Sequence, residues 1–215
     1  MKLYLILLSL LPLFAGLSLA AQKTWELKKD QNGIKVYSRA DDSARFNDLK
    51  VEMTLTAKLS SLAALILDID NYSNWSFNTE KSYVLKKISL SELYFYTLIH
   101  SPWPASNRDL AVHLRLVQDS NTRVLAISAI EIANFIPEKK GIVRVPLSVE
   151  RWTVTPHAGG KISIRYELQL DPGAAAPPWL INMFSVKGPF ETFTHLREQI
   201  QKPKYRDAPA AFIKN

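Results

Sequence analysis

The spacing of hydrophobic residues predicts a chain built mostly from antiparallel strands. Two runs near its start, 33–39 and 49–56, alternate apolar and polar residues, which is typical of a β-hairpin. Helical spacing follows over 58–68, with a short turn at 70–75. Six later runs have strand character and predict a long antiparallel meander: 83–88, 93–99, 110–117, 123–130, 143–154 and 161–170.

Two of these runs predict the shape of the sheet. In 161–170 the even-numbered positions from Ile162 to Leu170 are apolar and the positions between them are polar. We therefore expect one face of the sheet to be exposed to solvent. In 143–154 the apolar positions change parity between Val149 and Trp152. Such a change predicts a β-bulge that bends the sheet.

The C-terminal part predicts a long amphipathic helix. Asp171-Pro172-Gly173 ends the last strand, and Pro177-Pro178 suits the first turn of a helix. Gly188-Pro189 should kink this helix, because proline removes a backbone donor, and leave a front segment that moves as a lid on a hinge. One apolar stripe follows at helical spacing: Trp179, Met183, Val186, Phe190, Phe193 and Ile200.

A curved antiparallel sheet followed by a long helix packs most simply when the sheet wraps around the helix. We therefore expect an α+β protein in which the concave face of the sheet forms a pocket under the helix. One domain over 21–201 is expected. A basic flexible tail, rich in Lys, Arg, Pro and Ala, is expected over 202–215.

Residues 1–20 have the features of a signal peptide. One lysine precedes an apolar run over 3–19, and Ser18 and Ala20 are the small residues that a signal peptidase recognises. We expect a mature protein that begins near Ala21 and is exported to the periplasm, with an uncleaved membrane anchor as the alternative. The absence of cysteine fits export, and it excludes a lipoprotein attachment, a thiolate metal site and a cysteine nucleophile.

The formal net charge of +7 favours anionic partners, and we expect transient contact with an anionic membrane surface. Nucleic acid is not an expected partner of an exported protein, and a monomer is expected. Basic residues are mostly scattered, apart from pairs such as Lys86-Lys87 and Lys139-Lys140. A solvated surface is therefore the alternative explanation of the charge.

No recognisable catalytic or metal-binding motif occurs in the sequence. The four histidines lack metal-ligand spacing, and no HExxH, GxSxG, P-loop or glycine-rich dinucleotide motif is present. Asp68 and Asp70 lie two positions apart at a helix end, so their side chains diverge instead of forming an acid–base pair. We expect a protein that is not an enzyme and uses no cofactor or metal.

Short motifs at the joints of the predicted elements occur in a characteristic order: Trp25 with 33–37, Leu67–Asp70 through Trp75, Pro102–Asp109, Gly141–Arg144, Trp152 with Pro156, and 171–173 through Trp179 and Asn182. In this order they resemble the START family, the lipid-transfer domains related to the steroidogenic acute regulatory protein. The resemblance implies a helix-grip (START/Bet v 1-like) fold. It also implies a deep tunnel between the sheet and the C-terminal helix that holds one lipid or sterol.

In that family, ligand access is thought to involve the C-terminal helix and a loop that faces it. The corresponding loop here is 131–141, with an apolar tip at Phe135-Ile136-Pro137 and a positive base at Lys139-Lys140. An apolar tip beside a basic collar suits docking on an anionic bilayer.

The candidate lipid-binding residues come from the strands, the loop and the helix. Arg108 either points into the tunnel, where a guanidinium can hold a polar ligand group, or forms a structural ion pair with Asp109. An apolar helical stripe is also compatible with ordinary core packing. The complete set is Trp75, Arg108, Leu110, Val112, Phe135, Ile164, Tyr166, Trp179, Asn182, Met183 and Phe184.

Three functions fit these observations. The first is binding and transfer of a single hydrophobic lipid or sterol in a cavity gated by the C-terminal helix. The second is a cyclase-like or hydrolase-like enzyme that acts on a hydrophobic substrate in the same cavity, because fold alone does not settle function. The third is an interaction protein whose cavity is filled by its own side chains. The identity of the ligand and of the membranes is open at this point.

Overall fold

The computed structural model describes residues 24–40, 46–173, 176–209 and 211–215. The predicted signal peptide therefore lies outside the described residues. The strands are β1 (Glu26–Gln31), β2 (Ile34–Arg39), β3 (Asp48–Thr56), β4 (Thr79–Lys87), β5 (Glu92–Ile99), β6 (Arg108–Gln118), β7 (Leu125–Glu131), β8 (Val143–Arg144), β9 (Leu147–His157) and β10 (Lys161–Asp171). The helical segments are α1 (Leu59–Leu67), η1 (Ile69–Asn74), α2 (Pro178–Asn182), η2 (Met183–Lys187), α3 (Gly188–Gln199) and α4 (Pro203–Arg206).

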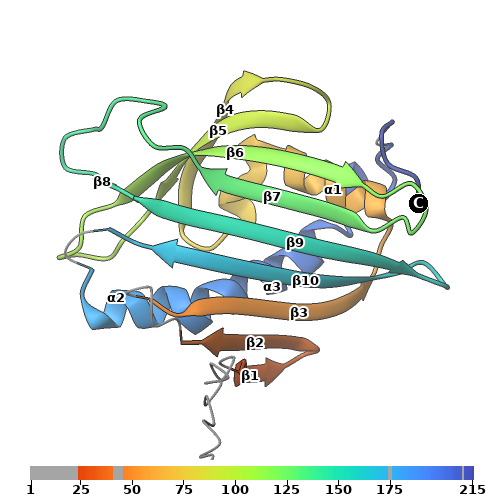
Figure 1. Cartoon of the computed structure of the whole chain (residues 1–215), viewed down its shortest axis with the longest axis horizontal. Coiled ribbons are helices and arrows are strands. Elements are labelled where there is room, and N and C mark those ends of the chain that lie inside the picture. Colours follow the sequence, from red (N-terminus) through yellow and green to blue (C-terminus); the bar gives the residue numbers. More distant parts are fainter. Residues whose placement is uncertain (1–23, 41–45, 174–175, 210) are drawn as a thin grey trace, which may run out of the picture.

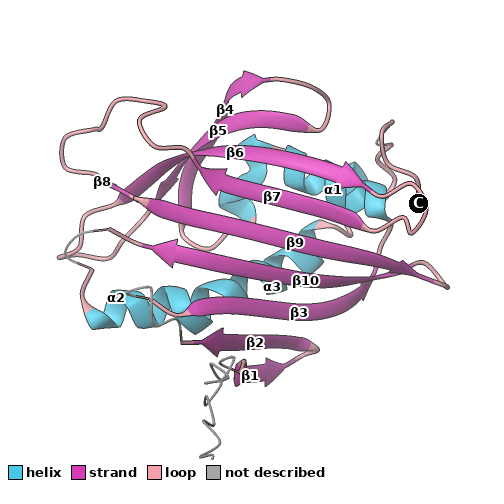
Figure 2. Ribbon diagram, in the orientation of Figure 1, coloured by secondary structure: helices cyan, strands magenta, loops and turns pink. Residues whose placement is uncertain are grey.

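The strands form one curved sheet with the helices on its concave side, as Figure 1 and Figure 2 show. Its strand order is β1-β2-β3-β10-β9-β7-β6-β5-β4 with antiparallel neighbours, and β8 pairs with β6 in parallel. Helix α3 lies across the concave face, where Phe193 packs its ring 5.1 Å from Trp152 and 5.2 Å from Tyr166. The predicted α+β helix-grip architecture is confirmed.

The run 143–154 differs from the prediction of a single bulged strand. It is divided into β8 and β9. Strand β9 pairs with β10 in one unbroken register, from the pair Leu147–Asp171 at one end to the pair His157–Lys161 at the other. The change in parity arises because Glu150 occupies an inward position between the buried side chains of Ser148 and Trp152. A polar residue on the concave face therefore gives the same sequence pattern as a β-bulge.

Two other elements also differ from prediction. Strand β1 was not predicted, because it is a largely exposed edge strand without apolar alternation. Residues 203–209 and 211–215, for which the sequence predicts a flexible tail, pack against the domain. Tyr205 is buried and donates its hydroxyl to Asp68, and the Lys214 backbone N–H donates to Gln118 over 2.8 Å. The composition of these residues is typical of a solvent-exposed segment, but the side chains of Tyr205 and Ile213 are buried.

The C-terminal helix changes type where Gly188-Pro189 predicted an interruption. The front segment, which we define as residues 178–187, consists of α2 and the π-helical η2, and α3 begins at Gly188. Proline has no backbone N–H, so the preceding turn cannot complete regular α-helical bonding. A Cβ atom on Gly188 would lie 3.0 Å from Cδ1 of Phe77, so glycine allows the helix to approach that ring. No helix among the described residues is long and apolar enough to cross a membrane.

Candidate functional site: an inner cavity under the C-terminal helix

Two adjoining hollows lie between the concave face of the sheet and the C-terminal helix, and we call them together the inner cavity. The larger hollow has a volume of about 140 Å³ and reaches Phe184 and Phe193 of the helix. The smaller hollow has a volume of about 100 Å³ and is lined by Trp75 and Trp152. Residues common to both linings are Tyr72, Ser76, Phe95, Glu150, Tyr166 and Thr192.

Glu150 is the charged residue of this cavity. Neither lining contains an Asp, Lys, Arg or His within the described ranges. Glu150 is partly buried and lines both hollows. Burial raises the pKa of Glu150 to about 7, although interactions with the Trp152 and Tyr166 side chains partly oppose this shift. Sequence reasoning missed Glu150, and the parity change at Val149 and Trp152 was the signal that could have found it.

Aromatic rings form the walls on either side of this carboxyl. Tyr72 makes edge-to-face contacts with Trp75 at 4.8 Å and with Phe95 at 5.4 Å, and Trp152 contacts Tyr166 at 4.8 Å. The Tyr72 hydroxyl donates to the carbonyl of Ile66 over 2.7 Å. Trp75 is buried, but its indole Nε1–H has no hydrogen-bond partner. The N–H of Trp75 is therefore enclosed by the protein, whereas Glu150 belongs to the linings of both hollows.

A third hollow, which we call the outer groove, lies along the front segment. Its volume is about 440 Å³, and it is lined by Ile181, Asn182 and Val186 together with residues of β2 and β3. Leu170 and Phe184 line both the outer groove and the inner cavity. The ring of Phe184 also meets that of Phe77 edge-to-face at 5.9 Å. Phe184 thus separates the two spaces.

The predicted site residues occupy several different environments. Trp75, Leu110, Val112, Tyr166 and Phe184 line the inner cavity, whereas Asn182 lines the outer groove. The other predicted residues line neither space: Ile164 is buried in the core, Met183 is partly buried, and Phe135 and Trp179 are 39% and 41% exposed, respectively.

Arg108 does not line the inner cavity and is not paired with Asp109. Its guanidinium donates to the carbonyl of Pro172 over 3.3 Å, to the Ser101 hydroxyl over 3.1 Å and to the carbonyl of Ser106 over 2.5 Å. Both alternatives from the sequence therefore need correction. Adjacent residues of a strand point to opposite faces, which separates the two side chains. Arg108 instead ties the start of β6 to the Pro172-Gly173 turn before the helix.

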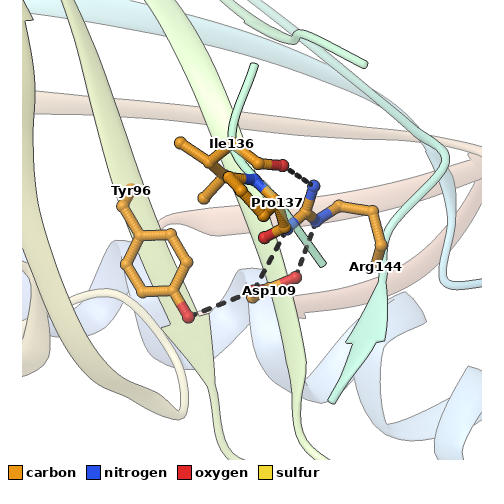
Figure 3. A network of polar contacts seen from close by, with 5 residues as sticks. All are labelled: Tyr96, Asp109, Ile136, Pro137 and Arg144. Atoms are coloured by element: carbon orange, nitrogen blue, oxygen red, sulfur yellow. Dashed lines mark hydrogen bonds and ion pairs between the residues drawn. The ribbon is translucent and has the colours of Figure 1, made fainter. Parts of the chain in front are cut away.

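Asp109 pairs with Arg144 of β8, as Figure 3 shows. Arg144 Nε lies 2.7 Å from Asp109 Oδ1, and the Tyr96 hydroxyl donates to the same carboxylate over 3.2 Å. The guanidinium also donates to the carbonyls of Ile136 and Pro137 over 3.1 and 3.2 Å (Figure 3). This network fixes the loop between β7 and β8 to the sheet.

The same loop does not contribute to the inner cavity. Phe135 stacks on Tyr94 with the ring centroids 4.7 Å apart, and the Lys139 ammonium lies 3.7 Å from the centroid of Tyr96. None of the loop residues 132–142 belongs to the linings of the inner cavity or the outer groove. Within the described ranges, no group of three or more His, Cys, Asp or Glu residues could hold a metal ion.

A curved sheet closed by a C-terminal helix over an apolar internal cavity defines the helix-grip class of proteins. The START domain family model matches residues 8–206, and the chain belongs to this family, whose members generally bind or transfer lipids.

Individual relatives are consistent with this assignment. The chain is 29% identical over 188 residues to an uncharacterised protein of Pseudomonas aeruginosa, covering 87% of this chain and 91% of the relative. It is 28% identical over 172 residues to the phosphatidylcholine transfer protein of Rattus norvegicus, covering 76% of this chain and 78% of that protein. The crystal structure of a STAR-related lipid transfer protein fragment from Xanthomonas axonopodis superposes with a TM-score of 0.76 and 29% identity, covering 83% of this chain and 99% of the fragment.

Proposed function

We propose that this protein binds a single hydrophobic lipid in the inner cavity and transfers it between membrane surfaces. The observation that carries this proposal is an internal cavity lined by aromatic and aliphatic side chains beneath the C-terminal helix. Removing one ligand methylene from water contributes roughly 0.8 kcal/mol, so a long alkyl chain is stabilised strongly in such a cavity.

The front segment is the proposed gate. The hollows of about 140 and 100 Å³ are smaller than the 300–1,000 Å³ or so that is typical of pockets for drug-sized ligands. Binding of a whole lipid therefore requires the cavity to widen. The π-helical turn Met183–Lys187 and the Gly188-Pro189 junction border the larger hollow, and a shift of Phe184 would join it to the outer groove.

One end of the molecule is the proposed membrane-docking surface. The β5–β6 loop, the β7–β8 loop and α2 lie at the same end of the molecule, on the left of Figure 1. They carry exposed apolar side chains at Trp103, Phe135 and Trp179, of which Trp103 is 91% exposed. Lys139-Lys140 adds positive charge to the same loops. Exposed aromatic residues beside lysines favour an anionic membrane surface.

Native mass spectrometry of the purified protein, followed by transfer of fluorescent lipids between liposomes, tests this function. We expect a bound molecule of defined mass and transfer that Trp179→Glu with Met183→Glu abolishes. Lys161→Glu is the matched charge control, because Lys161 is exposed at the far end of β10. Failure to extract any lipid class would overturn the proposal.

A second candidate function is acid–base catalysis on a hydrophobic substrate, and Glu150 is the observation that favours it. A carboxyl group with a pKa of about 7 in an apolar cavity has the properties of a general acid or base. The cavity linings, as far as the chain is described, offer no histidine or second carboxyl to complete an acid–base pair. Recovery of the bound molecule with unchanged mass after prolonged incubation favours binding, whereas a new mass that depends on Glu150 favours an enzyme.

A further inference from the structure

Residues 211–215 are held against the domain by side chains that contact their main chain. Gln118, at the end of β6, donates from Nε2 to the carbonyl of Lys214 over 2.7 Å, and its Oε1 accepts from the Lys214 N–H over 2.8 Å. Arg123, which precedes β7, donates from Nη1 to the main-chain oxygen of Asn215 over 3.0 Å. Figure 1 shows the segment beside the β6–β7 turn. These contacts recognise a peptide backbone, much as a neighbouring strand does.

The β6–β7 turn has hydrogen bonds of its own that hold Gln118 and Arg123 in position. The Asp119 carboxylate accepts from the backbone N–H groups of Asn121 and Thr122 over 3.0 and 2.7 Å. The Nε2 group of Gln118 also donates to the carbonyl of Arg123 over 3.0 Å. The turn therefore presents both side chains in a geometry that residues 211–215 do not have to create.

The N-terminus of α1 supplies the second half of the contact. The first N–H groups of a helix have no partner within the helix, and a side chain just before the helix commonly accepts from one of them. Lys58, at the N-cap position, forms no capping hydrogen bond through its side chain within the described part of the chain. Asn215 Oδ1 instead accepts from the N–H of Ser60 over 2.9 Å. A residue 155 positions away in the sequence thus caps the helix.

Ile213 provides the apolar contact of the segment. Its side chain is 8% exposed, whereas Lys214 and Asn215 are exposed. Phe212 is partly buried and packs against the core. Paired main-chain hydrogen bonds together with a buried side chain are the means by which proteins recognise extended peptides.

We propose that the β6–β7 turn and the N-terminus of α1 form a peptide-binding site, and that residues 211–215 are its exchangeable ligand. The ligand class is an extended peptide in which a branched aliphatic residue is followed two positions later by asparagine. A tethered segment has an effective concentration on the order of 1 mM, so the wild-type protein keeps the site occupied by its own residues. A free peptide of the same sequence binds once they are displaced. This inference does not depend on the proposed lipid-binding function.

Binding of a fluorescein-labelled peptide with the sequence of residues 207–215 tests the site. The full-length Ile213→Asp variant displaces its own segment, because a carboxylate is unfavourable in the apolar position of Ile213. We expect fluorescence anisotropy to show one peptide bound per chain of this variant, and binding to the wild-type protein that is about tenfold weaker or less. A peptide that carries the same Ile213→Asp substitution is the matched control and should not bind.

Further variants identify the residues responsible. In the Ile213→Asp chain, Gln118→Ala and Arg123→Ala should each weaken peptide binding by about fivefold or more, since each removes a hydrogen bond to the main chain of the peptide. Gln199→Ala and Arg165→Ala are the matched controls, because these side chains make their contacts elsewhere in the domain. Circular dichroism checks that each variant is folded.

Hydrogen exchange provides a second measurement that needs no displaced segment. If residues 211–215 dock as one unit, Gln118→Ala in the otherwise wild-type chain should speed exchange of the Ser60 N–H by about fivefold or more, although the acceptor of that N–H is Asn215. Gln199→Ala should leave this rate unchanged.

Three results would overturn the proposal. If a folded Ile213→Asp variant binds no peptide, residues 211–215 are a packed segment without an exchangeable site. If the variant and the wild-type protein bind the peptide equally, the peptide occupies another surface. If the Ser60 N–H exchanges at the wild-type rate in Gln118→Ala, the turn and the helix do not form one site, and this result decides the question even if Ile213→Asp does not fold.

Discussion

Arg144 donates a hydrogen bond of 2.7 Å from Nε to Oδ1 of Asp109, and this ion pair connects positions 35 residues apart in the sequence. The Asp109 side chain is 1% exposed and that of Arg144 is 11% exposed. The pair fixes the short strand β8, and with it the loop that carries Phe135, to the beginning of β6.

Removal of the charge of Asp109 is therefore expected to destabilise the protein. Asp109→Asn leaves a largely buried guanidinium without its counter-charge, which typically costs about 3 kcal/mol or more. Urea unfolding followed by circular dichroism measures the free energy of unfolding. Glu167→Gln breaks the more exposed Arg165–Glu167 pair and should cost less than about 1 kcal/mol. Equal effects of the two substitutions would contradict the structural role of the Asp109–Arg144 pair.

Phe184 is expected to control the rate of ligand exchange. Phe184→Ala removes the ring that separates the outer groove from the inner cavity and contacts Phe77. We expect ligand release to become about tenfold faster or more, because truncation of a large aromatic side chain opens a path between the two spaces. Stopped-flow release of a fluorescent lipid measures this rate.

Phe190→Ala is the control for the gate, because Phe190 lies on α3 beneath the ammonium of Lys29 and lines neither space. A release rate that is unchanged in Phe184→Ala would argue against a gate at this position.

The proposed docking surface predicts binding to anionic vesicles that depends on salt. Lys139→Glu with Lys140→Glu should weaken co-sedimentation with phosphatidylglycerol vesicles by at least about fivefold per lysine, because each lysine near such a surface contributes about 1 kcal/mol. Trp103→Ala should weaken binding further by removing an aromatic side chain that is 91% exposed.

Lys86→Glu with Lys87→Glu is the matched control, since these exposed lysines lie on β4, outside the proposed docking loops. If this pair weakens vesicle binding as much as the loop pair, net charge and not a defined surface determines binding.

Glu150 predicts an unusual dependence of stability on pH. Burial raises the pKa of its carboxyl from 4.5 to about 7 in the folded protein. Between these values the folded protein holds a proton that the unfolded chain has released, so this contribution to stability is present at low pH and is lost as the pH rises through about 7. One pKa unit corresponds to about 1.4 kcal/mol, so the loss is on the order of 3 kcal/mol.

Urea unfolding at pH 5 and pH 8 measures this effect without ligand. Glu150→Gln cannot ionise and should reduce the difference between the two pH values, whereas Glu138→Gln on the exposed loop should leave it unchanged. A difference that persists in Glu150→Gln would assign the pH dependence to other groups.

The amino-acid pattern by itself determined most of the secondary structure. The alternation in 161–170 and the helical stripe after Pro178 are local signals, and strand β10 and the C-terminal helix follow them. The position of the break at Gly188-Pro189 was also predictable, since proline has the same effect on any helix. Five of the predicted site residues, Leu110 and Phe184 among them, line the inner cavity, because apolar parity indicates which side of a strand or helix is inward.

The tertiary structure decided what depends on distant partners. Only the sheet register directs Glu150 to the concave face beside Tyr166, and only the return of β8 to β6 brings Arg144 to Asp109. The burial of Tyr205 likewise depends on helix α1, far away in the sequence. A sequence pattern reports the local preference of the backbone, whereas the partner of a polar side chain depends on which strands meet. The cavity and its apolar lining could therefore be predicted from the sequence, but the Glu150 carboxyl within it could not.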